Sequence, residues 1–163
     1  MERAEHHDLV LERTIEAPVD LLWKAWTDPD HLRKWWAPKP YETIECEIDL
    51  RPGGVFHTRM IGPDGFDEPG TGCFLEIVPN RKIVWTSVLG PEYRPVAPEN
   101  CGGLSFTAIV TFTAQGGRTR YRAVAMHKDE ADRDMHEKMG FHEGWGTVAG
   151  QLEQVARELG ETV

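Results

Sequence analysis

The sequence predicts an α+β fold in which a curved antiparallel sheet of about six or seven strands surrounds one long C-terminal helix. The helix is predicted from residues 141–159, where apolar side chains recur on about a third of a 3.6-residue helix. The sheet is predicted from short apolar or alternating stretches, each bounded by turn residues. Successive strands joined by short connections must be antiparallel. The apolar face of the sheet and the apolar stripe of the helix are most simply buried against each other.

The C-terminal helix has the clearest pattern in the chain. Its apolar stripe is Trp145, Val148, Ala149, Leu152, Val155, Ala156 and Leu159, and the opposite side carries Gln151, Glu153, Gln154, Arg157 and Glu158. Gly160 is expected to end the helix. Before the helix the stripe breaks near Gly140, so we expect a separate turn or short helix over residues 129–139.

The chain before this helix is predicted to hold one strand, two short helices and then six strands. The first strand is expected at residues 9–15. Pro18 suits the first turn of a helix over residues 19–26, and Asp28-Pro29 can start a second helix that runs through residues 32–36. The other strands are expected at residues 41–50, 55–61, 72–78, 83–89, 104–113 and 119–127.

Size and composition limit the classes of function. A length of 163 residues suits one domain over residues 1–163, with residues 1–8 as an N-terminal tail. The 18 basic and 27 acidic residues give a net charge of −9 with no basic cluster, so nucleic acid is not an expected partner. No apolar run reaches the ~18 residues of a membrane span, so no membrane insertion is expected. The odd set of Cys46, Cys73 and Cys101, without a CxxC pair, favours a cytoplasmic location.

Several stretches resemble the family named after the activator of a heat-shock-protein ATPase. They are EAPVDLLWKAWTDPDHLRKWW at residues 16–36, RPGG at 51–54, GCFLEIVP at 72–79, GGRT at 116–119 and GW at 144–145. These stretches span nearly the whole chain in the expected order. The family belongs to the START-like, helix-grip superfamily (SRPBCC), which includes lipid carriers, plant hormone receptors and polyketide cyclases. The resemblance implies a helix-grip fold with a cavity between the sheet and the long helix.

The wall of the implied cavity is expected to be mainly apolar. On the strand over residues 55–61, the face with Phe56 and Met60 suits a cavity better than the face with Arg59, because burying an unpaired arginine is costly. Of Trp35 and Trp36, one ring is expected to pack the short helices onto the sheet, and the other to shield the cavity mouth. The candidate ligand-binding residues are Trp36, Phe56, Thr58, Met60, Phe74, Trp85, Tyr121, His127, Met139, Phe141 and Trp145.

If the protein is an enzyme, the candidate catalytic residues are Tyr121, His127 and Glu76. Tyr121 and His127 are in phase on one strand, and Glu76 lies between apolar residues, so each could transfer protons from an inner face. A rim histidine and a solvent-facing glutamate are the structural alternatives. His127, His136 and His142 lack metal-ligand spacing and no nucleotide-binding motif occurs, so neither a metal nor a cofactor is expected.

The sequence leaves three functions open. We favour non-catalytic binding of a small, largely apolar molecule in the cavity, because spacing alone assembles no nucleophile–base–orienter set. The second function is a cyclase- or hydrolase-type enzyme that uses the same cavity. The third is a co-chaperone or other protein-interaction module, and a homodimer is left open as well. The loop over residues 90–103 is a candidate lid. The segment over residues 129–140 is either a second candidate lid or a rigid join between the sheet and the long helix.

Overall fold

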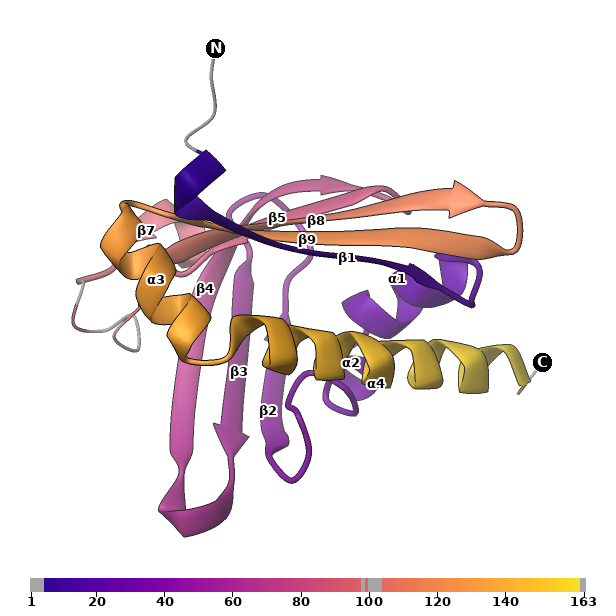
Figure 1. The fold of residues 1–163 in the computed structure, drawn as a ribbon, viewed down its shortest axis with the longest axis horizontal. Coiled ribbons are helices and arrows are strands. Elements are labelled where there is room, and N and C mark those ends of the chain that lie inside the picture. Colours follow the sequence, from indigo (N-terminus) through magenta and orange to yellow (C-terminus); the bar gives the residue numbers. More distant parts are fainter. Residues whose placement is uncertain (1–4, 98, 100–103, 162–163) are drawn as a thin grey trace.

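The computed structural model describes residues 5–97, 99 and 104–161, and in this part of the chain one antiparallel sheet is covered on one face by helices (Figure 1). The strand order is β1-β9-β8-β5-β4-β3-β2, and every neighbouring pair is antiparallel. The strands are β1 (Asp8–Ile15), β2 (Glu42–Ile48), β3 (Val55–Ile61), β4 (Asp67–Val78), β5 (Lys82–Thr86), β8 (Phe106–Gln115) and β9 (Arg118–His127). The predicted helix-grip architecture is therefore confirmed.

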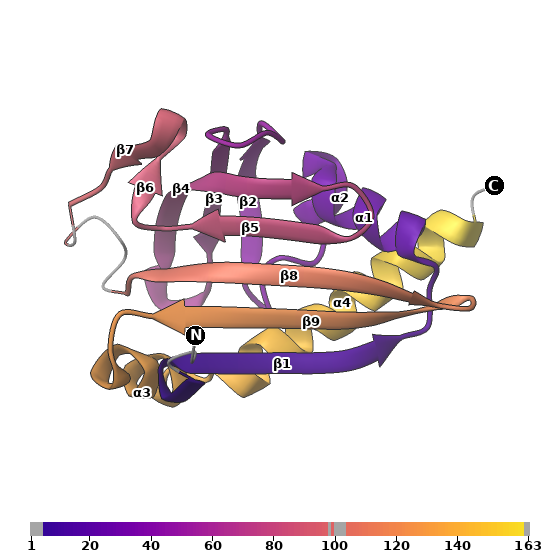
Figure 2. The ribbon, with the colours of Figure 1, turned by 90° about the horizontal axis from the view of Figure 1, so that it is seen from above.

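The helices all lie on the concave side of the sheet. They are α1 (Val19–Thr27), α2 (Pro29–Leu32), α3 (Glu130–Lys138) and α4 (Phe141–Glu161). Figure 1 shows β2, β3 and β4 turning away from the direction of the other strands, with α4 running in the angle between the two groups. Figure 2 shows α4 passing obliquely beneath β8, β9 and β1. Register shifts between Thr43 and Glu45 and between Phe74 and Glu76 mark irregularities that help a sheet to bend.

The core lies between the concave sheet face and these helices. Fully buried side chains come from the sheet (Ile15, Phe74, Ile83) and from the helices (Leu22, Leu152), and they belong to one contiguous cluster. Burial of such side chains is the main favourable term in folding, at roughly 1.5–3 kcal/mol for each large one.

The second short helix ends earlier than predicted. Asp28 caps it through a hydrogen bond from the Asp30 amide and Pro29 begins it, as expected, but α2 stops at Leu32 instead of continuing to Trp36. The chain turns there and buries the Trp35 ring, whose indole N–H donates to the carbonyl oxygen of Ala25 at 2.9 Å. Main-chain hydrogen bonds from Trp35 and Trp36 to the carbonyl oxygen of Leu32 still form a turn here, although the regular helix has ended.

Two strands differ from the prediction by three or more residues at one end. β4 begins at Asp67 and not at residue 72, because residues 67–71 pair with β3 alone. The side without a partner tolerates Pro69, which cannot donate a ladder hydrogen bond. β5 ends at Thr86, and Leu89–Gly90 instead forms β6, which pairs with β7 (Arg94–Pro95).

The structure differs from the prediction near both ends of the chain. Residues 5–7 form a 3-10 turn and β1 begins at Asp8, so the expectation of a tail through residue 8 is wrong for the described residues. α4 continues past Gly160 to Glu161. A Cβ at Gly160 would lie 3.1 Å from Cδ1 of Leu21, so this glycine allows the close approach of α1 rather than ending the helix.

Two further 3-10 turns complete the described elements, at Pro63–Gly65 and Pro91–Tyr93. The predicted loop at residues 90–103 holds the second of these and β7, and the rest of it lies partly outside the described residues. None of the helices in the described part of the chain is long and apolar enough to span a membrane.

Candidate functional site

A pocket of about 300 Å³ lies between the concave sheet face and α4. The strands contribute Leu11, Met60, Trp85, Phe106, Val110, Tyr121 and Ala123. The short-helix region contributes Trp26, Trp35, Trp36 and Pro38. From α3, α4 and their junction come His136, Met139, Gly140, Phe141, Gly144, Trp145, Val148 and Ala149. The lining is dominated by aromatic rings, with few polar atoms among them.

Aromatic side chains form a continuous layer around the pocket. The centroid of Trp36 lies 5.5 Å from Trp26 and 6.0 Å from Trp85, and Trp85 lies 5.4 Å from Phe106. Phe106 in turn lies 6.0 Å from Trp145. Such ring pairs add to the hydrophobic burial and give the walls a defined shape.

Most of the predicted ligand-binding residues line this pocket. They are Trp36, Met60, Trp85, Tyr121, Met139, Phe141 and Trp145. Phe56 and Phe74 stack on each other behind the wall, with centroids 5.0 Å apart, and belong to the solid core. Thr58 is half-buried on β3 opposite Cys46 and does not reach the pocket lining.

The structure places Glu76 outside the pocket. Its side chain is exposed and its Oε1 lies 3.0 Å from the Nζ of Lys82. The register shift beside it leaves Phe74 on the inner face and directs Glu76 to solvent. Glu76 therefore has no place among the catalytic candidates, and the solvent-facing alternative holds.

Tyr121 presents its hydroxyl group inside the core. The side chain is 5% exposed, and its oxygen accepts a hydrogen bond from the indole N–H of Trp26 at 3.2 Å. Burial raises the pKa of Tyr121 to about 12, so the phenol keeps its proton near neutral pH. The hydroxyl hydrogen is not used in that bond, and Tyr121 is one of the residues that line the pocket.

His127 and His136 form a buried pair next to the pocket. Nε2 of His127 lies 2.9 Å from Nδ1 of His136, and its Nδ1 lies 2.7 Å from the main-chain carbonyl oxygen of His7. Burial, with a smaller contribution from His127, lowers the pKa of His136 to about 4. Of this pair, His136 lines the pocket. The predicted ligand-binding residue His127 does not line it, and is linked to it only through the hydrogen bond with His136.

Sequence reasoning missed His136 as a pocket residue. His142 does not join this pair, because its Nε2 bonds to Glu137 on the surface. His127 and His136 come together because β9 turns directly into α3, a geometry that helical spacing does not describe. Within the described residues, no three side chains of metal-ligating type are grouped to hold an ion.

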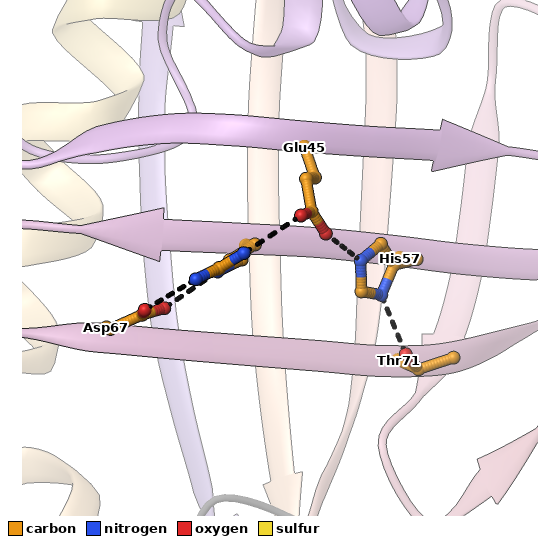
Figure 3. A network of polar contacts seen from close by, with 5 residues as sticks. Glu45, His57, Asp67 and Thr71 are labelled. Atoms are coloured by element: carbon orange, nitrogen blue, oxygen red, sulfur yellow. Dashed lines mark hydrogen bonds and ion pairs between the residues drawn. The ribbon is translucent and has the colours of Figure 1, made fainter.

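A second polar network lies on the opposite face of the sheet (Figure 3). Glu45 on β2 accepts hydrogen bonds from His57 and Arg59 on β3, and these reach Thr71 and Asp67 on β4. Hydrogen bonds from His57 and Arg59 hold the pKa of the Glu45 carboxyl below its usual value. These side chains are exposed or half-buried and none of them lines the pocket, so this network is separate from it.

The polar side of α4 also contributes to the site. The amide nitrogen of Gln151 donates to the carbonyl oxygens of Trp35 and Ala37, at 3.0 and 2.8 Å. Its oxygen accepts from the amide of Lys39 at 3.2 Å. One side chain thus fixes the segment that carries Trp36 and Pro38, two residues of the pocket wall.

The fold defines the class of this protein: it is a START-like helix-grip protein, in which a bent antiparallel sheet holds one long helix. The family model described as "Activator of Hsp90 ATPase homolog 1-like protein" matches residues 16–157. The chain therefore belongs to this family. Among curated proteins, no sequence matches it.

Solved structures share the same fold. Protein NE0264 from Nitrosomonas europaea is 42% identical, with a TM-score of 0.91 and coverage of 98% of this chain and 99% of that chain. Protein Ms6760 from Mycobacterium smegmatis is 24% identical, with a TM-score of 0.77 and coverage of 95% and 93%. An AHSA1-like protein from Aeromonas hydrophila is 18% identical, with a TM-score of 0.69 and coverage of 94% of each chain. The last two show the fold alone.

Proposed function

We propose that this protein binds a small, largely apolar molecule in the pocket between the sheet and α4, without transforming it. The observation that carries the proposal is the pocket itself, whose volume of about 300 Å³ and aromatic lining suit a compact ring-containing ligand. A few polar atoms among apolar walls are the usual means by which such sites orient a ligand.

The state of the polar groups supports binding over catalysis. Tyr121 stays protonated and already accepts a hydrogen bond from Trp26. Both nitrogens of His127 are engaged, by His7 and by His136. Within the described residues, no nucleophile stands beside a base in the pocket, which is what covalent catalysis requires.

A thermal-shift screen of fatty acids, simple aromatics and polyketide-like compounds tests the proposal. A ligand that binds the folded state alone raises the melting temperature as its concentration passes Kd, following RT ln(1 + [L]/Kd). Binding beside Trp36, Trp85 and Trp145 should also quench or shift tryptophan emission.

Two outcomes of these experiments would favour a different function. If no compound stabilises the protein, the binding proposal fails and a protein-interaction module takes its place. The exposed Met139 at the pocket and the exposed Met135 on α3 would then be the first surface to examine. If a bound compound is chemically changed, and Tyr121→Phe or His127→Ala stops the change but not the binding, the protein is an enzyme.

A further inference from the structure

A chain of hydrogen bonds runs from the N-terminal turn to the pocket wall. It begins at the carbonyl oxygen of His7, passes through His127 at the end of β9, and ends at His136 on α3. Both imidazoles are 7% exposed. His136 lines the pocket, and its Nε2 is the ring nitrogen that His127 does not engage.

The carbonyl oxygen at the start of the chain fixes the position of every hydrogen. A carbonyl oxygen can only accept, so Nδ1 of His127 carries the hydrogen of that bond. In neutral His127 the Nε2 is then an acceptor, and Nδ1 of His136 must donate to it. Neutral His136 consequently has no hydrogen on Nε2, which presents a lone pair.

Within the described residues, this lone pair has no hydrogen-bond partner. Among the described residues, no hydrogen bond reaches Nε2 of His136, and the atom is not one of the fully buried ones that lack a partner. The rings of Phe106, Phe141 and Trp145 surround the imidazole, with centroids 5.0, 5.2 and 5.8 Å away. The low pKa of His136, about 4, keeps the ring neutral near pH 7. An acceptor without a donor in an apolar wall favours a ligand that brings the donor.

We propose that the pocket selects apolar, ring-containing molecules that carry a hydroxyl donor, such as phenols and enols, and that this hydroxyl donates to Nε2 of His136. His127 is a positioning residue, because it acts on the ligand only through the tautomer of His136. This inference rests on the proposed function and specifies which apolar molecules the pocket prefers.

Isothermal titration calorimetry with two probes tests the preference. 2-Naphthol carries the hydroxyl donor, whereas 2-methoxynaphthalene has the same rings without it. Wild-type protein should bind 2-naphthol roughly 2- to 10-fold more tightly, which is the net effect of one hydrogen bond to a neutral group. His136→Phe keeps an apolar ring but removes the acceptor, so this variant should bind both probes equally. His142→Phe is the matched control, because His142 bonds to Glu137 outside the pocket, and it should keep the wild-type preference.

The outcomes separate this inference from the proposed function. Equal binding of both probes by wild-type protein, or an unchanged preference in His136→Phe, would overturn the role of His136 while the pocket remains a binding site. Absence of binding by both probes would contradict both proposals.

The positioning role of His127 has its own test, which also covers the case that His136→Phe does not fold. Long-range ¹H–¹⁵N spectra of wild-type protein near pH 7 should show hydrogens on Nδ1 of both histidines. A hydrogen on Nε2 of His136 would overturn the proposal. A glutamine at position 127 can donate to the His7 carbonyl and accept from His136, so His127→Gln should keep the preference for 2-naphthol, and His127→Phe should lose it. Equal behaviour of the two variants would show that His127 positions nothing.

Discussion

Gln151 illustrates how single residues depart from the helical pattern. The pattern places it on the polar side of α4, yet its side chain makes three hydrogen bonds to the main chain of residues 35–39. Gln151→Ala should lower the free energy of unfolding by about 1–3 kcal/mol, because it leaves the carbonyls of Trp35 and Ala37 without a donor. Gln154→Ala, three residues along, should stay within about ±0.5 kcal/mol, since Gln154 bonds to Glu158 on the exposed surface of the helix. Chemical denaturation measures both free energies of unfolding. Equal effects of the two substitutions would contradict a stabilising role for the hydrogen bonds of Gln151.

His136 should make stability depend on pH. Its pKa falls from the usual 6.5 to about 4 in the folded protein, so in this range the unfolded chain binds more protons and stability falls as pH falls. The rings that contact His136 in the described structure are those of Phe106, His127, Phe141 and Trp145. Denaturation of wild-type protein at pH 7 and pH 5 should show a larger loss than in His136→Phe.

The comparison of the two proteins isolates this effect from other groups. Carboxyls whose pKa is lowered by ion pairs, such as Glu12, Glu45 and Asp67, lose their contribution at lower pH and do so equally in both proteins. His142→Phe should keep the wild-type loss. If wild-type protein and His136→Phe lose the same stability, His136 does not remain neutral through burial.

At the scale of elements, the turn between β2 and β3 depends on Gly54. A Cβ at this position would lie 1.9 Å from the carbonyl oxygen of Asp49, and this oxygen belongs to the backbone and cannot rotate away. The turn is also tied to β4 through hydrogen bonds between Gly53, Gly54 and Phe74. Gly54→Ala should therefore lower the free energy of unfolding by about 3 kcal/mol, the upper end of typical overpacking.

Gly70 provides the matched control for this prediction. It lies in β4, and a Cβ there would meet nothing within 4 Å. Gly70→Ala should leave stability unchanged or raise it by about 0.4–1 kcal/mol, because the unfolded chain loses freedom. Thermal or chemical denaturation measures the stability of both variants. If Gly54→Ala lowers the free energy of unfolding no more than Gly70→Ala, the close contact at Gly54 does not restrict the turn.

The existence and type of most elements could be predicted, but their ends could not. Periodicity and turn residues identify the sheet strands and α4 because they report which faces are buried. At the end of α2 the Trp35 ring is buried and bonds to Ala25, and at Gly160 the close approach of Leu21, not a helix stop, explains the glycine. Both are contacts between parts of the chain that are not adjacent in sequence. Local sequence carries no signal for such contacts.

At the scale of the whole molecule, the same distinction applies to the pocket. Phase along a strand separates inner from outer faces, so Met60, Trp85 and Tyr121 could be predicted as wall residues. It does not tell a wall residue from a core residue, which is why Phe56 and Phe74 were also expected to bind a ligand. The depth of a side chain below the sheet depends on where α4 crosses it, and the sequence does not specify that crossing.

The pocket of about 300 Å³ is a volume that side chains do not fill, so the protein lacks the packing contacts that would stabilise it there. Val148 on α4 lines this space and is half-buried, so Val148→Phe would extend a ring into it. We expect this variant to gain about 0.5–2 kcal/mol in free energy of unfolding, as cavity-filling substitutions commonly do. It should also lose the rise in melting temperature that an apolar ligand gives to wild-type protein. Val10→Phe, on the edge strand β1 and away from the pocket, should keep that rise. A ligand that stabilises Val148→Phe as much as wild-type protein would place the binding site elsewhere.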